Sequence, residues 1–320
     1  MQVYLPEGTL LGTPENYELT ATAAGLERAM AAHRVVEGMA VRCDEDLTLH
    51  VDLGALRGEI AADEVVLRRA DEARKDIAVI SRVGKAVAAR VLGFEHRGGE
   101  TVAVLSRRLA QEDCRRDFLS HLRAGDLIPA RVTHLEPFGA FLDIGCGIVS
   151  LLPVDQISVS RISHPRDRLS VGTDLTVAVR SVDPATGRIN STLRELLGTW
   201  EENAARFTVG QTVTGVLRSV EPYGVFVELA PNLAGLAEVR GERHAAELRA
   251  QVGRGAAVYI KSILPARMKI KLVLIDFGFP PPRQRPLPYF IDPVATLHVG
   301  SWIYSPPGAG KTVETRFDPD

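Results

Sequence analysis

Residues 136–144 read EPFGAFLDI, and residues 221–229 read EPYGVFVEL. The two stretches share the pattern Glu-Pro-aromatic-Gly-x-Phe at a constant offset of 85 positions, from 138 to 223. More matching segments follow, because Val171-Gly172 recurs as Val252-Gly253 and residues 179–184 recur as residues 260–265. This self-similarity indicates two copies of one structural unit.

Each copy has the pattern of a small β-barrel, with short β-branched runs separated by Gly, Pro and Asp turns. Successive side chains of a strand point to opposite faces, so an inward Leu142 leaves Phe141 pointing outward, and Phe226 likewise. The same alternation places four more residues of the later copy on the outer face: Tyr259, Lys261, Lys269 and Lys271. Outward aromatic rings beside outward basic side chains are typical of a surface that stacks nucleobases and contacts phosphates.

A third, weaker copy precedes the other two. Residues 38–54 resemble the start of the repeat with the aromatic segment deleted, residues 58–60 resemble its third strand, and residues 97–100 predict a hairpin turn. The acidic run Asp44-Glu45-Asp46 is predicted to form a turn between two strands. Because the aromatic pair is missing, we expect this copy not to stack bases.

The repeats and the segments between them predict the domain organisation. Residues 109–119 lack helix breakers and predict a helix. A helical stripe follows the second copy and should pack on a neighbouring barrel: Leu193, Leu196, Leu197, Trp200, Ala204 and Phe207. The predicted parts are an N-terminal extension (1–35), a degenerate barrel (36–108), a helical linker (109–123), a barrel (124–192), a helical linker (193–208), a barrel (209–276) and a Pro-rich C-terminal segment (277–320).

The C-terminal segment combines two kinds of sequence. Residues 280–288 are rich in Pro and include Arg283 and Arg285, which predicts an extended linker. Four aromatic residues beyond its start suggest that the remainder docks on another part of the chain: Tyr289, Phe290, Trp302 and Tyr304. The run GKT at 310–312 resembles the end of a phosphate-binding loop. However, Ser305 stands where that loop needs Gly, and the chain after Thr312 is too short for the required helix.

Composition excludes several classes of protein. The 320 residues carry a net charge of −2, which argues against a basic-tail mode of nucleic-acid binding. Three cysteines without a CxxC pair argue against a structural zinc site or a disulfide scaffold. No apolar run approaches the roughly 20 residues of a membrane span, so we expect no membrane association and a cytoplasmic location. Because familiar catalytic motifs are missing, we expect no enzyme, cofactor or metal.

Residues 136–145, followed by Val171-Gly172, residues 177–183 and residues 187–189, resemble the S-one domain. This is the OB-fold RNA-binding repeat of the bacterial small-subunit ribosomal protein S-one. The resemblance is strong for residues 124–195, good for 208–275 and weak for about 36–108. The whole chain resembles three-repeat clostridial relatives of that ribosomal protein. The resemblance implies a mainly β fold of tandem five-stranded OB-fold barrels joined by short helices.

The family's RNA-facing positions are two aromatics three residues apart, a His after the third strand, and an Asp and an Arg near the last hairpin. In the second copy they fall on Phe138, Phe141, Pro153, Asp183 and Arg188, and in the third copy on Tyr223, Phe226, Glu238, Leu264 and Lys269. The His is therefore replaced in both copies and the Asp in one. The pair of stacking aromatic residues and one basic residue are present in both copies.

The leading hypothesis is a non-enzymatic protein that binds single-stranded RNA, in particular mRNA, and acts in translation on or near the small ribosomal subunit. The alternative is a protein-interaction module in which the degenerate copy docks the chain onto a ribosome or an RNA-decay complex. An enzyme that uses Gly310-Lys311-Thr312 ranks last. The residue His134, two positions before Glu136, is interpreted as an ordinary surface residue.

Overall fold

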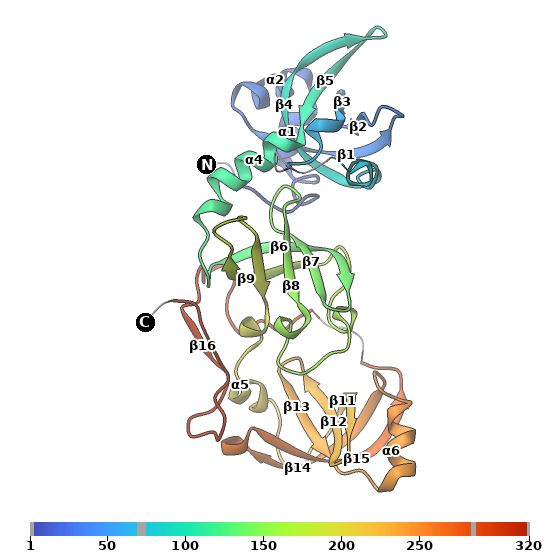
Figure 1. Cartoon of the computed structure of the whole chain (residues 1–320), viewed down its shortest axis with the longest axis vertical. Coiled ribbons are helices and arrows are strands. Elements are labelled where there is room, and N and C mark those ends of the chain that lie inside the picture. The colour runs from blue at the N-terminus through green and yellow to red at the C-terminus, as the bar shows by residue number, and fades with distance from the viewer. Residues whose placement is uncertain (1–2, 69–74, 283–285, 319–320) are drawn as a thin grey trace. The chain divides into compact units, whose positions relative to one another are not determined.

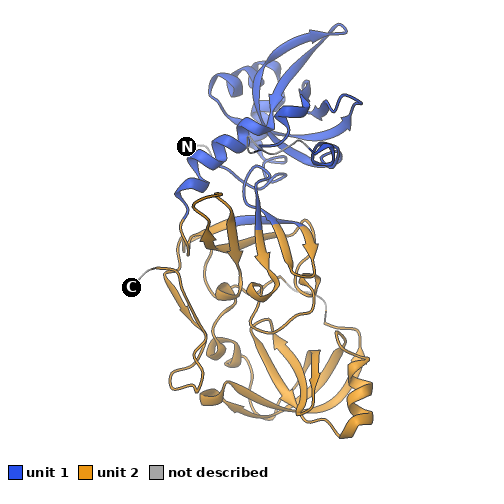
Figure 2. Cartoon of the chain, in the orientation of Figure 1, with its two compact units in different colours: residues 1–122, 129–133, 142–150 blue, residues 123–128, 134–141, 151–320 orange. Residues whose placement is uncertain are grey.

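A computed structural model of the chain describes residues 3–68, 75–282 and 286–318 (Figure 1). The chain divides into two compact units. Unit 1 comprises residues 1–122, 129–133 and 142–150, and unit 2 comprises residues 123–128, 134–141 and 151–320 (Figure 2). The boundary between the units crosses the strands of the second barrel. Each unit is described by itself below.

The described residues form three closed five-stranded barrels and one two-stranded sheet. The first barrel contains β1 (Val35–Cys43), β2 (Leu49–Asp52), β3 (Arg57–Ile60), β4 (Ala86–Arg97) and β5 (Glu100–Ser106). The second contains β6 (Leu127–Glu136), β7 (Gly139–Asp143), β8 (Val149–Pro153), β9 (Asp174–Val182) and β10 (Ile189–Thr192). The third contains β11 (Thr212–Glu221), β12 (Gly224–Ala230), β13 (Leu233–Ala237), β14 (Gly255–Leu264) and β15 (Lys269–Phe279).

All three barrels share one strand order, in which the third strand pairs in parallel with the fifth. The first two strands and the last two form antiparallel pairs, as in β1 with β2 and β14 with β15. Inward side chains such as Leu142 in β7 and Val227 in β12 are fully buried. The prediction of a mainly β chain of tandem five-stranded OB-fold barrels is therefore confirmed.

The glycine of the Glu-Pro-aromatic-Gly motif is required by close packing of the backbone. A Cβ atom at Gly139 would lie 2.6 Å from the Leu152 carbonyl oxygen, and one at Gly224 would lie 2.7 Å from the Ala237 carbonyl oxygen. Both carbonyls belong to the third strand of the same barrel. A side chain at either position would push the second and third strands apart, which explains why both copies have glycine here.

The first copy is a complete barrel. The sequence suggests that the aromatic segment between its first two strands is deleted, but the structure has a full hairpin there. In β1 and β2, Met39 pairs with Asp52 and Arg42 with His50, as Val216 pairs with Glu228 and Ser219 with Phe226 in the third barrel. The hairpin that contains the turn at 44–46 thus takes the place of the aromatic segment. The prediction of a deletion is wrong, because seven residues separate Arg42 from His50, one more than the six between Ser219 and Phe226, and it is the residue types that differ.

Unit 1 also contains α1 (Pro14–Thr20), α2 (Ala23–Ala31), the short helix α3 (Asp76–Ile80) and α4 (Arg107–Asp117). The sequence of the N-terminal extension predicts no structure for it. Leu26 and Ala29 of α2 are fully buried in the core of the first barrel, so the extension is part of that fold. The predicted helix at 109–119 corresponds to α4.

Buried charges stabilise unit 1 around one carboxylate. The Arg107 guanidinium donates to both carboxylate oxygens of Glu7, at 2.6 and 2.9 Å. The backbone N–H of Glu7 donates to the Asp143 carboxylate at 2.7 Å. Burial, followed by the nearby charge of Glu7, raises the pKa of Asp143 to about 6. Asp143 points out of its barrel, as alternation predicts, but is only 2% exposed because these residues cover it.

Unit 2 uses the equivalent carboxylate of the third barrel in the same way. Glu228, which matches Asp143 at the repeat offset, accepts a hydrogen bond from Arg218 Nε at 2.7 Å and pairs with Arg168. Arg218 also lies 3.2 Å from Asp167. Arg168 and Asp167 precede β9 of the second barrel. These ion pairs join the second and third barrels within unit 2, so neither outward carboxylate is left for solvent or a ligand.

A fully buried asparagine completes this junction. Asn232, between β12 and β13, accepts a hydrogen bond from the Val159 N–H at 2.9 Å. Its amide donates to the carbonyls of Arg194 and Gly198, at 2.8 Å each. The predicted helical stripe at 193–207 is therefore held against the third barrel. It forms a short 3₁₀ turn and α5 (Trp200–Ala204), because Gly198 at φ 82° interrupts the helix.

The C-terminal segment docks within unit 2, as its aromatic residues suggest. The Tyr304 hydroxyl donates to the Asn232 carbonyl at 2.6 Å, and the Tyr289 hydroxyl donates to the Thr176 carbonyl at 3.0 Å. Trp302 packs in the core of the third barrel. The strands β16 (Ser301–Ile303) and β17 (Glu314–Arg316) form a hairpin that contains the GKT run. Arg283 and Arg285 of the predicted linker lie outside the described residues. The remaining helix of this unit, α6 (Gly241–Arg249), packs Leu248 into the core of the third barrel.

Among the described helices, none is long and apolar enough to cross a membrane.

Candidate nucleic-acid interface

The motif of the second barrel places two aromatic rings together on its outer surface. Phe138 lies in the turn between β6 and β7, and Phe141 lies in the middle of β7. The ring centroids are 5.9 Å apart with the planes at 88°, an edge-to-face pair. Phe138 is 56% exposed although it is a large apolar side chain, and Phe141 is half-buried. Such an exposed pair costs solvation free energy, which a stacked base would recover.

The third barrel repeats this arrangement with a tyrosine. Tyr223 lies in the turn before β12 and Phe226 within it, with ring centroids 6.2 Å apart and planes at 89°. Tyr223 is 67% exposed and Phe226 is half-buried. The rings of each pair are therefore brought together as the sequence predicts. We call these two pairs the aromatic platforms.

A histidine extends the platform of the second barrel. His134 on β6 lies nearly parallel to Phe141, with centroids 6.2 Å apart and planes at 28°. Its Nε2 lies 2.7 Å from the Glu136 carboxylate. The sequence alone predicts an ordinary surface residue at His134 and does not predict this contact. Pairing of β6 with β7 across the hairpin is the signal that could have found it, because the same register pairs Ser219 with Phe226.

Asp183 and Arg188 flank the turn between β9 and β10, and the two have different surroundings. The Asp183 carboxylate accepts hydrogen bonds from the Thr186 hydroxyl at 2.6 Å and from the Ala185 N–H at 2.9 Å. The Thr186 hydroxyl, followed by these backbone N–H groups, lowers the pKa of Asp183. Asp183 thus stabilises its own turn. Arg188 is exposed at the end of this turn, where its guanidinium can reach a phosphate.

The basic residues of the third barrel lie on the same face as its platform. Across the sheet, Phe226 pairs with Leu236 and Leu236 pairs with Lys271, so Phe226 and Lys271 belong to one cross-strand row. Lys269 lies two residues before Lys271 on β15, and Tyr259 pairs with Val273 two residues after it. Lys261 lies at the bulge beside this row. All four predicted residues are exposed: Tyr259, Lys261, Lys269 and Lys271.

The equivalent face of the first barrel carries charges in place of aromatic rings. His50, at the position of Phe226, is buried, and its Nε2 lies 2.6 Å from the Asp44 carboxylate. The Nδ1 atom lies 3.5 Å from Glu59, which also accepts a hydrogen bond from Arg97 at 3.0 Å. Acidic and basic groups here satisfy one another. This face therefore offers no flat ring on which a base could stack.

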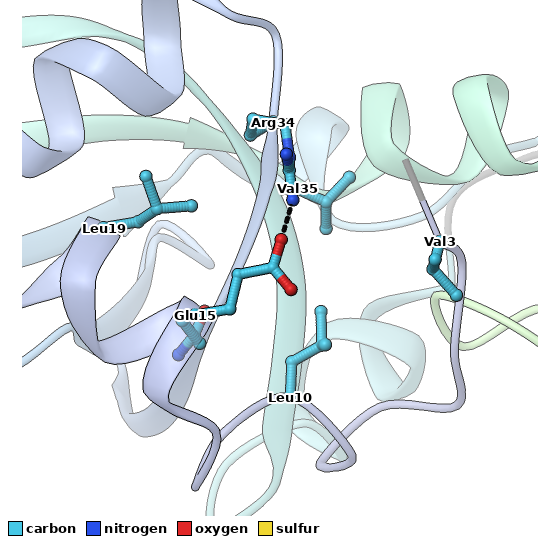
Figure 3. Close-up of a pocket in the computed structure, with 7 residues that line it drawn as sticks. Val3, Leu10, Glu15, Leu19, Arg34 and Val35 are labelled. Carbon is cyan, nitrogen blue, oxygen red and sulfur yellow. Dashed lines mark hydrogen bonds and ion pairs between the residues drawn. The ribbon is translucent and has the colours of Figure 1, made fainter. Parts of the chain in front are cut away.

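Unit 1 contains a cavity of about 310 Å³ that is separate from the platforms (Figure 3). Apolar residues, Asn16 and one ion pair line it. The Glu15 carboxylate and the Arg34 guanidinium point toward each other and form that pair. The Asn16 side chain is already engaged, because its amide donates to the Glu37 carbonyl at 2.9 Å and its oxygen accepts from the Glu37 N–H at 2.8 Å.

Closed five-stranded barrels of this strand order define the OB-fold class, and paired exposed aromatic rings beside basic residues are typical of the members that bind single-stranded nucleic acid. Residues 121–194 match the model of the family "S1 RNA binding domain". The matched residues contain the whole second barrel, and the family is the S-one domain family that the sequence resembles.

The similar curated proteins are ribosomal. The small ribosomal subunit protein bS1 of Mycolicibacterium smegmatis is 28% identical over 277 residues, which are 84% of this chain and 56% of the relative. The protein bS1 of Staphylococcus aureus is 34% identical over 146 residues, 44% of this chain and 37% of the relative. The chain thus spans about half, or less, of the length of the curated relatives it matches.

A solved structure also matches over much of the chain. It is a multidomain protein with nucleic acid binding domains from Streptococcus pneumoniae, 13% identical, with a TM-score of 0.24, covering 76% of this chain and 73% of that one. The narrower resemblance to three-repeat clostridial proteins stays a prediction.

Proposed function

We propose that the chain binds single-stranded RNA through its second and third barrels and acts in translation on or near the small ribosomal subunit, with mRNA as the bound strand. The observation that supports this most directly is the repeated aromatic platform, Phe138 with Phe141 and Tyr223 with Phe226. The S1 family of residues 121–194 supports RNA as the ligand. The bS1 relatives support the ribosomal setting.

In this proposal bases stack on the platform rings, and cations at the edge of each platform bind the phosphates. Arg188 supplies the cation in the second barrel, and Lys269 and Lys271 supply it in the third. Asp183 acts by shaping the turn that presents Arg188. Tyr259 and Lys261 extend the basic face of the third barrel. The proposed role is binding without catalysis, no metal or cofactor is needed, and the ribosomal relatives favour a cytoplasmic location.

The test replaces the rings of one platform. Phe138→Ala with Phe141→Ala should weaken binding to a short unstructured RNA by about 2–6 kcal/mol, at about 1–3 kcal/mol per stacked base. Fluorescence anisotropy measures the affinity, and circular dichroism checks the fold. Tyr17→Ala is the control, because Tyr17 is an exposed aromatic residue of α1 that belongs to neither platform. Unchanged affinity in the folded double variant would refute the proposal for this barrel.

The alternative, that the first barrel serves as a protein-interaction module, is favoured by one observation. Its platform positions are occupied by the ion pairs of His50, Glu59 and Asp44. If this barrel does not bind RNA, removing all four platform rings should abolish RNA binding by the whole chain. Residual tight binding in that quadruple variant would assign an RNA site to the first barrel instead.

A further inference from the structure

The second barrel has a feature that the third lacks. The exposed imidazole of His134 lies nearly parallel to the Phe141 ring, with the ring centroids 6.2 Å apart and the planes at 28°. The side chain of His134 is 61% exposed, so one face of the ring is open to solvent. The contact with Glu136 at 2.7 Å holds the ring in this orientation. A held ring loses little conformational entropy when a base stacks on it.

The matching positions in the other barrels do not carry such a ring. At the repeat offset of 85, His134 corresponds to Ser219, which pairs with Phe226 across β11 and β12. In the first barrel the equivalent residue is Arg42, which pairs with His50. The second barrel therefore has three adjacent rings on its outer face: His134, Phe141 and Phe138.

The charge beside this ring favours a base over the sugar–phosphate backbone. Glu136 is 40% exposed next to His134, so a phosphate placed there would meet a like charge. Arg188 lies on a different strand connection, between β9 and β10, and offers the opposite charge. An RNA strand with its phosphates toward Arg188 and its bases on the rings would meet a favourable contact on both its charged and its apolar side.

We propose that His134 is a third base-stacking residue of the second barrel, held in place by Glu136, and that this barrel binds one more unpaired base than the third. This inference rests on the proposed function, since it requires RNA to lie on the platform. It adds a contact residue and a difference in ligand length between the two barrels.

The experiment uses the full chain with Tyr223→Ala and Phe226→Ala, so that the affinity reports the second barrel. Fluorescein-labelled oligouridylates of three to eight nucleotides are the probes. His134→Ser, which copies the third barrel, should lower the affinity about five- to tenfold. It should also shorten by one nucleotide the length at which the affinity reaches its plateau. His134→Tyr should keep both, because it keeps a ring.

His134→Leu separates stacking on RNA from simple support of Phe141. Leucine preserves an apolar contact with Phe141 but has no aromatic face, so it should bind as weakly as the serine variant. If the leucine variant binds like the parent, His134 only positions Phe141 and the inference is wrong. If serine has no effect while Phe138→Ala and Phe141→Ala abolish binding, this inference fails and the proposed function stands. If none of these substitutions matters, the proposed function itself fails.

Discussion

The buried carboxylate of Glu37 makes the stability of unit 1 depend on pH. Glu37 on β1 is 1% exposed and accepts hydrogen bonds from the N–H groups of Gly8 and Leu10, at 3.1 and 2.9 Å. Burial, followed by the nearby charge of Glu7, raises the pKa of Glu37 from 4.5 to about 7. The folded state therefore binds this proton more tightly than the unfolded state.

The raised pKa predicts a pH dependence with a definite sign. A carboxylate with a raised folded pKa stabilises the fold at low pH, and that stability is lost as the pH rises from the unfolded pKa to about 7. Between pH 5 and pH 8 the loss should be roughly 2 kcal/mol for the first barrel. Hydrogen exchange of the β1 amides, corrected for intrinsic rates, measures it.

Glu37→Gln is the matched variant for this prediction. The glutamine oxygen can still accept the two backbone hydrogen bonds but does not ionise. The variant should therefore equal the parent at pH 5 and be more stable at pH 8. Equal protection of parent and variant at both pH values would contradict the assigned cause.

Among the strands, those at the end of the second and third barrels differ in charge. In the third barrel, β14 and β15 present Lys261, Lys269 and Lys271, whereas the second barrel presents Arg188 at the matching hairpin. Phosphate contacts carry no sequence information. We therefore expect the third barrel to contribute a more salt-dependent and less selective share of the binding.

Replacing these three lysines by Gln should reduce the slope of log affinity against log salt concentration by about 2, at about 0.7 per phosphate contact on a single strand. The preference between a pyrimidine and a purine oligomer should remain nearly the same. A control removes three charges from the same barrel but from α6 and its start: Arg240, Arg243 and Arg249. Equal slope changes in the two triple variants would mean that the lysines provide only general charge.

At the scale of the whole molecule, the C-terminal segment gives unit 2 contacts that the barrels alone do not have. The buried Tyr304 hydroxyl donates to Asn232, the residue that also bonds Val159, Arg194 and Gly198. In addition, the buried Thr315 hydroxyl donates to Glu195 at 2.7 Å. Burial raises the pKa of Tyr304 well above its usual value, so the hydroxyl stays protonated and remains a donor.

Tyr304→Phe should destabilise unit 2 by about 1–2 kcal/mol, because the Asn232 carbonyl loses its partner inside the protein. Both tryptophans of the chain, Trp200 and Trp302, are buried in unit 2. Their fluorescence during urea unfolding therefore reports on this unit. Tyr259→Phe is the control, since Tyr259 is exposed. A shared midpoint for the two variants would show that the docked segment does not stabilise the unit.

Local sequence patterns are sufficient to predict the barrels and the aromatic platforms. The Glu-Pro-aromatic-Gly-x-Phe motif is local: strand alternation turns Phe141 and Phe226 outward, and close strand packing demands Gly139 and Gly224. Such features depend on neighbours a few residues away, so they can be read from one stretch of chain. The docking of Trp302 and Tyr304 was also visible as unpartnered aromatic residues, although the partner was not.

Contacts across strands and between distant elements depend on the folded arrangement and could not be predicted from local patterns. The stacking of His134 on Phe141 depends on hairpin register, and the burial of Asp143 and Glu228 depends on Glu7, Arg168 and Arg218 from distant segments. Alternation gives the side of a strand but not what covers it. The sequence of the first barrel suggests a shortened repeat because residues 43–49 contain no aromatic residue. The strand pairing shows that the hairpin is nevertheless present.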